Sequence, residues 1–230
     1  QSKAAVNFMK NVLEAKTVFI LDDKTTYSQH LAEYVAEACK KEGIEVVAHD
    51  HVNEGDMDFS AVLTKVKRAK PDVFYMSLQN SSSGIRMIKQ ARQLRLECEI
   101  LSQDAVYHPN FIKEAYDQAQ DVYFTFGWVD KDSETYQKFI KVYKELFGDP
   151  GAYSAYSFDS TYAILTAIKN ADGSTKPEDI RKQMMALEMA GASKNIKFME
   201  NGDSGSNYII YQVQGDEFMP FYDPATGKKF

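Results

Sequence analysis

The sequence of 230 residues contains only two cysteines, Cys39 and Cys98, and their spacing matches no metal-binding motif. Cys39 lies in the apolar stripe of a predicted helix, and Cys98 opens a predicted strand. We therefore expect both to be small core residues, which can pair only if the fold brings them together. The cysteine content says little about the cellular compartment.

Long apolar runs and a surplus of basic residues are also missing. No stretch approaches the ~18 to 20 consecutive apolar residues that a membrane-spanning helix needs. Residues 1–16 carry scattered charges and no apolar core followed by small residues, so we expect that any export signal was removed or never present. The 27 basic and 33 acidic residues give a net charge of −6, which argues against a nucleic-acid partner.

The sequence also lacks the motifs of several enzyme classes. Both glycine-rich nucleotide-binding patterns and the Gly-x-Ser-x-Gly turn of hydrolases are missing. The pair Asp22-Asp23, at the end of a predicted strand, is similar to the magnesium-binding pair of receiver domains, but Ser77 and Leu78 stand where the phosphoacceptor aspartate belongs. We instead expect the two aspartates to cap the following helix. No catalytic residue and no cofactor is predicted.

The 4 histidines are scattered, and no pair has the i, i+4 spacing of a helical metal site. His49 and His51 alternate along a predicted strand and therefore share a face. Because no Cys or Glu lies nearby in register, we expect them to be surface residues rather than metal ligands. The sequence predicts no metal site.

What the sequence does contain is a regular alternation of strands and helices. The stretch 17–21 is apolar throughout, which is typical of a central strand of a parallel sheet. Strands are predicted at residues 17–21, 45–52, 73–76, 99–101 and 122–126, with helices before and between them. After Trp128 three helices follow in succession, at residues 133–147, 154–170 and 177–187, before strands return at 196–198, 208–213 and 218–221. The alternation indicates an α/β fold whose parallel sheet is covered by helices on both faces.

Ligands of an open parallel sheet bind beyond the carboxyl ends of its strands. Three loops at that edge, residues 22–27, 77–84 and 102–107, are rich in short polar side chains and aromatic rings. Serines 81–83 before Gly84 can cradle a phosphate at a helix N-terminus, although a plain N-cap is the simpler interpretation. The candidate ligand-binding residues of the three loops are Tyr27, Gln79, Asn80, Ser81, Asp104 and Tyr107.

Asp104 is distinctive among these candidates. It follows a short buried strand, shares its loop with Gln103 and Tyr107, and has no adjacent cation in the sequence. A carboxylate in this position suits a ligand that carries an ammonium group. A turn-forming aspartate that bonds its own backbone explains the residue equally well.

Several segments together resemble the leucine/isoleucine/valine-binding proteins that feed ABC importers. They are residues 18–27, 55–65, 89–92, 149–156 and 201–203, which read VFILDDKTTY, GDMDFSAVLTK, KQAR, DPGAYSAY and NGD. The resemblance implies a type I periplasmic binding protein, with two flavodoxin-like lobes joined by three crossovers that close over a ligand in the cleft. On this template Tyr27 forms an aromatic wall, Asn80 lies in the ligand-facing loop, and Asp104 matches the acidic residue that holds the ligand's ammonium. Many relatives carry Glu at that position, and the polar loop around Gln79 indicates that the ligand need not be aliphatic.

The resemblance also implies that the chain begins where the first lobe hands over to the second. Residues 1–126 and 205–230 then form a complete α/β lobe, and residues 127–204 form the helical part of a second, incomplete lobe. Apolar stripes on those helices would have no sheet to cover, so we expect self-association or exchange of helices between copies. These stripes comprise Phe139, Val142, Tyr143, Leu146, Phe158, Tyr162 and Leu165.

The expected function is that of an extracytoplasmic solute-binding component of an ABC importer, which binds an amino acid or a similar small polar ligand and catalyses no reaction. Its expected partners are that ligand and the transporter's permease, and its expected location is periplasmic or extracellular, with or without a lipid anchor. Two alternatives stay open: a ligand-sensing ectodomain of a receptor with the same fold, and a flavodoxin-like enzyme or receiver-type domain.

Overall fold

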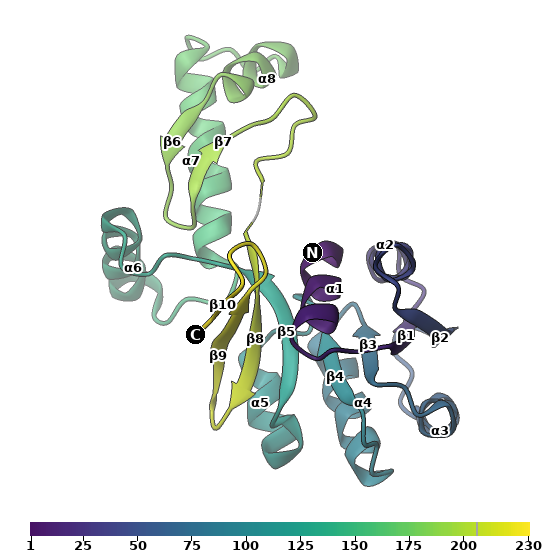
Figure 1. The fold of residues 1–230 in the computed structure, drawn as a ribbon. Helices are drawn as coiled ribbons and strands as arrows, with labels where there is room; N and C mark the ends of the chain where they lie inside the picture. The colour runs from purple at the N-terminus through teal and green to yellow at the C-terminus, as the bar shows by residue number, and fades with distance from the viewer. Residues whose placement is uncertain (206) are drawn as a thin grey trace. The chain divides into compact units, whose positions relative to one another are not determined.

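The computed structural model describes residues 1–205 and 207–230 (Figure 1). Contacts between residues divide the chain into two compact units. Unit 1 comprises Gln1–Gly127 and Tyr208–Phe230, and unit 2 comprises Trp128–Asn207. The chain therefore leaves unit 1 after its first 127 residues and returns to it for the last segment.

Unit 1 is built around an eight-stranded sheet with the order β10-β9-β8-β5-β4-β3-β1-β2. The five strands that come first in the chain pair in parallel. They are β1 (Thr17–Asp22), β2 (Glu45–His51), β3 (Val73–Ser77), β4 (Glu99–Ser102) and β5 (Val122–Gly127). The remaining strands extend the sheet in antiparallel fashion beside β5 and are β8 (Tyr208–Gln214), β9 (Glu217–Asp223) and β10 (Lys228–Lys229).

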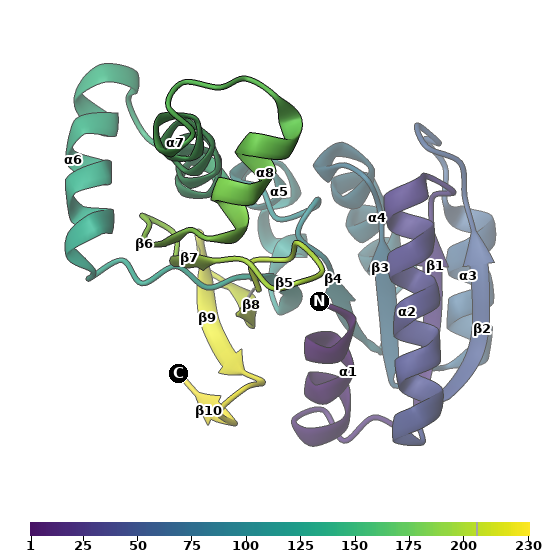
Figure 2. The ribbon, with the colours of Figure 1, turned by 90° about the horizontal axis from the view of Figure 1, so that it is seen from above.

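Helices cover both faces of this sheet (Figures 1 and 2). One face carries α1 (Ser2–Asn11) and α2 (Thr26–Glu42). The other carries α3 (Ser60–Ala69), α4 (Ser81–Gln93) and α5 (Pro109–Ala115), which is followed by the 3-10 turn Tyr116–Ala119. Alternate residues of β1 feed the two cores: Phe19 and Leu21 join the core under α3 and α4, and Val18 and Ile20 join the core under α1 and α2. The predicted α/β class is confirmed.

The C-terminal end and the buried face of α2 show how the local sequence determines a helix. Gly43 caps the helix with φ 77° in the left-handed region, and its N–H donates to the carbonyl of Cys39, as the sequence predicts. Leu31, Val35 and Cys39 form the buried stripe. The apolar spacing of the sequence also predicts Tyr34 in that stripe, but Tyr34 is 60% exposed, because the helix turns it away from the sheet.

Three predictions about strands were incomplete. The sheet is parallel only through β5, because the chain returns from unit 2 to pair β8 with β5 in the antiparallel sense. The strands β6 (Glu188–Ala190) and β10 were not predicted, since two or three residues are too short to show an alternating pattern. Residues 127–204 were predicted to be the helical part of a lobe with one strand at 196–198. That strand is present as β7 (Asn195–Lys197), and it pairs with β6 in a two-stranded antiparallel sheet.

Unit 2 contains three helices in addition to that small sheet, namely α6 (Glu134–Phe147), α7 (Ser154–Asn170) and α8 (Pro177–Met185). Its main polar anchor is Asp159 of α7, which is only 4% exposed. The carboxylate accepts hydrogen bonds from the N–H of Ala192 (2.6 Å), the N–H of Ser193 (2.7 Å) and the Ser193 hydroxyl (2.5 Å). A side chain at Gly191 would overlap with this carboxylate and approach the Lys194 carbonyl to 2.7 Å, so the turn between β6 and β7 needs glycine there.

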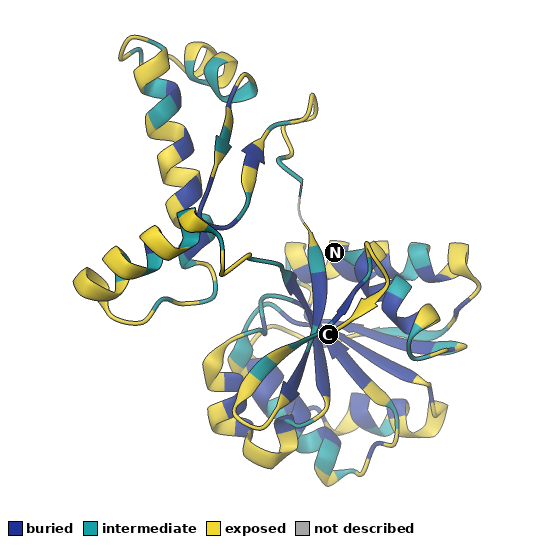
Figure 3. Cartoon of the chain, turned by 60° about the vertical axis from the view of Figure 1, so that its left-hand side comes forward, coloured by how far each residue is buried: buried dark blue, intermediate teal, exposed yellow. Residues whose placement is uncertain are grey.

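Much of the apolar surface of the unit 2 helices is exposed (Figure 3). Phe139 is buried and Tyr143 is partly buried against it, but the other apolar residues of the predicted stripes are exposed. The exposed side chains are Val142, Leu146, Phe147, Phe158, Tyr162, Ile164 and Leu165. Several of them line a hollow of about 430 Å³ between α6 and α7.

Both cysteines are unpaired, and Cys39 is buried while Cys98 is partly buried. Burial raises the pKa of the Cys39 thiol to about 12 and that of the Cys98 thiol to about 11. Their predicted role as small core residues is confirmed. None of the helices in the described part of the chain is long and apolar enough to cross a membrane.

Candidate ligand-binding site at the carboxyl ends of the strands

The three candidate loops follow β1, β3 and β4, which are neighbours in the sheet. Because these strands are parallel, all three loops leave the same edge of unit 1. Hydrogen bonds between the loops show that they meet there.

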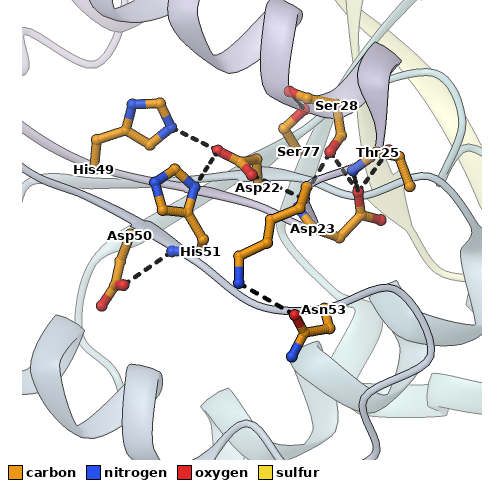
Figure 4. Close-up of polar contacts among 10 residues, drawn as sticks. Asp22, Asp23, Thr25, Ser28, His49, Asp50, His51, Asn53 and Ser77 are labelled. Carbon is orange, nitrogen blue, oxygen red and sulfur yellow. Dashed lines mark hydrogen bonds and ion pairs between the residues drawn. The ribbon is translucent and has the colours of Figure 1, made fainter.

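Asp23 connects the first loop with the second, and Figure 4 shows its contacts within the first loop. Its carboxylate is 2% exposed and accepts hydrogen bonds from the hydroxyls of Thr25 and Ser28, and from the N–H of Gln79 at 2.6 Å. The Ser77 hydroxyl donates in turn to the Ser28 carbonyl at 2.9 Å. A buried carboxylate with several donors is strongly held in place, so the loops after β1 and β3 form one ordered layer.

Gln103 connects the second loop with the third. Its side chain is fully buried, its amide donates to the Leu78 carbonyl, and its oxygen accepts from the N–H of Ala105. The neighbouring Ser102 hydroxyl donates to the Met76 carbonyl at 2.9 Å. The turn after β4 is therefore made by Gln103, and the side chain of Asp104 is left to point elsewhere.

Asp104 points to Tyr27. The Tyr27 hydroxyl donates to the Asp104 carboxylate at 2.6 Å, and the Gln1 side-chain oxygen lies 2.8 Å from the same hydroxyl. Asp104 is partly buried, and no described Lys, Arg or His forms an ion pair with it. The first and third loops are thus joined through the Asp104 carboxylate. The remaining acceptor positions of this carboxylate are available to a cationic group.

The charge of Asp104 acts on two tyrosines. Burial, followed by the nearby Asp104 carboxylate, raises the pKa of Tyr27 well above its usual value. The same two causes raise the pKa of Tyr75 on β3. Both hydroxyls therefore keep their protons, and that of Tyr27 donates to Asp104. The Tyr75 hydroxyl is buried without a hydrogen-bond partner among the described residues.

The second loop places its three candidates at the start of α4. Asn80 is the N-cap, and its side-chain oxygen accepts from the Ser83 N–H at 2.9 Å. The cap is thus the residue before the serine run, and Ser81 is the first residue of the helix. Gln79 lies partly exposed beside Asp23, with its side-chain oxygen 3.3 Å from the Thr25 hydroxyl. A ligand role for these three residues stays a prediction.

Tyr107 has a different setting from the other candidates. Its ring stacks on Phe126 with centroids 4.3 Å apart and on Phe218 with centroids 4.0 Å apart. Edge contacts to Phe124 and Tyr211 complete an aromatic cluster over β5, β8 and β9. The ring thus packs within unit 1, and its ligand role also stays a prediction.

The close approach of α4 to the third loop gives a test of this arrangement. A Cβ atom at Gly84 would overlap with the Cγ1 atom of the buried Val106. We expect Gly84→Ala to lower the free energy of unfolding by about 1–3 kcal/mol through overpacking, although alanine is otherwise favoured in a helix. Urea unfolding followed by circular dichroism measures the change. In the double variant with Val106→Ala the overlap disappears, so strictly additive losses would contradict this account.

The prediction that Asp22 and Asp23 cap α2 is wrong, because the N-cap of this helix is Thr25. Asp22 instead accepts hydrogen bonds from the imidazoles of His49 and His51. Both histidines were expected at the surface; His51 is exposed and His49 is partly buried. Asp22 was missed as their partner because it lies on another strand, and only the register of β1 against β2 brings it opposite His51.

Comparisons with known proteins agree with this fold. The family description "Periplasmic binding protein" matches residues 1–217. The chain is 27% identical over 222 residues to Leu/Ile/Val-binding protein homolog 1 of Brucella abortus, covering 96% of this chain and 56% of that protein. It is 24% identical to the leucine-, isoleucine-, valine-, threonine-, and alanine-binding protein of Pseudomonas aeruginosa, covering 94% of this chain and 58% of that protein. The chain thus spans a little over half the length of these relatives.

Solved structures show the same similarity. The leucine-binding protein LivK of Thermotoga maritima superposes with a TM-score of 0.87 at 28% identity, covering 95% of this chain and 63% of that one. LivJ of Streptococcus pneumoniae, in complex with isoleucine, shares the fold with a TM-score of 0.80 at 21% identity. The match covers 95% of this chain and 62% of that one. The resemblance to branched-chain amino-acid-binding proteins is confirmed, and the chain belongs to the periplasmic binding protein family.

Proposed function

We propose that the protein is the solute-binding component of an ABC importer and binds an amino acid, or a similar small ligand with an ammonium group, without changing it chemically. The observation that carries the proposal is the Asp104 carboxylate, which joins two ligand-edge loops through Tyr27 and forms no ion pair with any described cationic side chain. The relatives named above support the ligand class, because their names state binding of leucine, isoleucine and valine.

In this proposal Asp104 accepts hydrogen bonds from the ligand's ammonium group. Tyr27, which is 41% exposed, offers its ring as a wall and keeps the carboxylate in place with its hydroxyl. The buried Tyr75 hydroxyl is a further donor within the field of Asp104, and a polar ligand group or water that reached it would satisfy its hydrogen-bonding capacity. Gln79, Asn80, Ser81 and Tyr107 are the remaining predicted contacts.

We also propose that unit 1 is a complete lobe of the binding protein and that unit 2 belongs to the other lobe. The continuous sheet of unit 1, with helices on both faces, supports the first assignment. The exposed apolar helices of unit 2 support the second, since such helices normally cover a sheet. The permease of the importer is the proposed protein partner, and a periplasmic or extracellular location follows from the same role.

Calorimetric titration of the full-length protein with each of the twenty amino acids tests the proposed function. We expect a saturable heat change with one ligand or a small group of chemically similar ligands. Absence of binding for all twenty, in a sample with a cooperative unfolding transition, would contradict the amino-acid ligand.

We further propose that two copies of this chain associate through the exposed apolar side chains of α6 and α7. Leu146 and Phe147 are 64% and 72% exposed, and contiguous apolar surface of this kind usually finds a partner. Light scattering over a concentration series should show a mass that rises toward a dimer, and Leu146→Glu should shift the equilibrium toward the monomer. The control Gln29→Glu adds the same charge on unit 1 and should have no effect. A monomer at every concentration would contradict the proposal.

A further inference from the structure

A second polar cluster lies apart from Asp104, at the free edge of the sheet in unit 1. It consists of Asp22, the last residue of β1, and of His49 and His51 on the edge strand β2. The register places His51 opposite Asp22 and His49 opposite Ile20. Because alternate residues of a strand share a face, all three side chains lie on the same side of the sheet.

The three side chains converge on one point (Figure 4). The Nε2 atom of His49 and the Nδ1 atom of His51 each lie 2.7 Å from the same oxygen, Oδ2 of Asp22. One nitrogen of each ring and one carboxylate oxygen all lie within 4.8 Å of one another. The Asp22 side chain is fully buried, whereas those of His49 and His51 are 24% and 40% exposed.

The carboxylate is oriented by its other oxygen. Oδ1 of Asp22 accepts a hydrogen bond from the Lys24 N–H at 2.9 Å, which leaves Oδ2 aimed at the imidazoles. Carboxylates that bind a metal are commonly held in place by a further hydrogen bond of this kind. The imidazoles, being partly exposed, leave room for an incoming ion and for further ligands from solvent.

The charged neighbours point away from this convergence. The Lys24 ammonium group bonds the Asn53 side-chain oxygen at 3.1 Å. Asp50, although it stands between the two histidines in sequence, lies on the opposite side of the strand and pairs with Lys65 at 2.6 Å. The local set is thus one carboxylate and two imidazoles.

We propose that Asp22, His49 and His51 bind a divalent transition-metal ion of the Zn²⁺ kind. Two imidazoles and one carboxylate form a donor set that Zn²⁺, Co²⁺ and Ni²⁺ accept readily, whereas Mg²⁺ and Ca²⁺ prefer oxygen ligands alone. In a tetrahedral zinc site with bonds of about 2.0 to 2.1 Å, neighbouring ligand atoms are about 3.3 Å apart. The 2.7 Å separations seen here need to widen by roughly half an ångström, a shift that partly exposed imidazoles can make.

The competing explanation is that the two rings merely donate N–H groups to a buried carboxylate. In that case each imidazole satisfies Asp22 as a hydrogen-bond donor, and no metal is needed. The two explanations predict different Zn²⁺ binding for the variant His51→Gln. His51→Gln keeps a side-chain N–H that can bond Asp22, but it replaces the imidazole nitrogen with an amide, which is a poor zinc ligand.

The test uses the protein without a histidine tag, freed of metal by a chelator and then dialysed against ZnCl₂. We expect one Zn²⁺ per chain by elemental analysis, and at least roughly tenfold weaker Zn²⁺ binding in calorimetry for His49→Ala, His51→Ala and His51→Gln. His30→Ala is the matched control, because His30 is exposed on α2 and outside the cluster, and it should bind Zn²⁺ like the unaltered protein.

Co²⁺ provides a second measurement, because its visible absorption reports the coordination geometry of the bound ion. We expect the intense bands of a tetrahedral or five-coordinate site in the unaltered protein and in His30→Ala, and their loss in the three cluster variants. Circular dichroism checks that these variants are folded. Absence of stoichiometric Zn²⁺ binding, or binding that survives all three cluster substitutions, would overturn the proposal, whichever ligand the Asp104 site takes.

Discussion

Replacing Asp104 by alanine is expected to weaken binding of the amino-acid ligand severely. The carboxylate is the proposed partner of the ligand's ammonium group, and its loss would leave that charge without a counterpart in a partly buried site. Removing one member of such a charge pair costs about 2–5 kcal/mol, which corresponds to a roughly 30- to 4000-fold weaker Kd. Calorimetry with the best ligand from the amino-acid titration measures the change.

Two further variants separate charge from shape, and a third at another position serves as the control. Asp104→Asn keeps the size of the side chain without its charge and should lose most of the affinity, whereas Asp104→Glu keeps the charge and should retain more of it. Glu114→Ala removes an exposed carboxylate from α5 and should change nothing. If Asp104→Ala binds the ligand as tightly as the unaltered protein, the ammonium hypothesis is wrong, and the Tyr27–Asp104 hydrogen bond has only a structural role.

Replacing Asp159 by alanine should unfold unit 2 or greatly weaken it. The change removes a buried carboxylate that accepts three hydrogen bonds. The N–H groups of Ala192 and Ser193 and the Ser193 hydroxyl have then lost their acceptor. Two or more buried donors without partners cost about 3–5 kcal/mol together, a large part of the stability of a small unit. Trp128 is the only tryptophan and belongs to unit 2, so its fluorescence during urea unfolding reports on this unit.

The matched control for this variant is Glu145→Ala, which removes an exposed carboxylate from α6 of the same unit and should leave the urea midpoint nearly unchanged. Far-ultraviolet circular dichroism, to which the larger unit 1 contributes most of the signal, should retain its main transition in Asp159→Ala. An unchanged fluorescence midpoint would show that the β6–β7 turn does not depend on the carboxylate.

The order of elements in unit 1 was predictable from sequence because the physics that sets it is local. β1 and β3 are apolar on both faces, α2 ends at a glycine that adopts φ 77°, and each loop follows from the strand before it. The meeting of three loops was also predictable, since parallel neighbours share one edge for their carboxyl ends. Asp104 could be singled out for the same reason.

The roles of individual loop residues depended on information that sequence does not contain. Gln103 rather than Asp104 makes the turn, because the buried amide reaches the Leu78 carbonyl of a neighbouring loop. Asn80 caps α4 instead of the serines, and the ring of Tyr107 finds its stacking partners on β5 and β9. The roles of Gln103 and Tyr107 depend on contacts across the sheet, whereas the Asn80 cap depends on the residue at which α4 begins.

Strand register is the other quantity that could not be predicted. A shift of one residue between β1 and β2 would move Asp22 away from His51, and nothing in either strand alone specifies their alignment. The pairing of β8 with β5 is similar, because it joins segments separated by the whole of unit 2. Both cases concern partners that are distant in sequence.

The hydrogen bonds made by Asp23 and Gln103 have a consequence for the speed and heat of recognition. Side chains that are already locked in one rotamer lose little conformational freedom when a solute arrives, so the ordering cost of association falls mainly on the solute itself. In the proposed ligand site these loops act as a rigid template. We therefore expect the encounter with a small molecule to be limited by diffusion and desolvation, with no slow rearrangement of these loops beforehand.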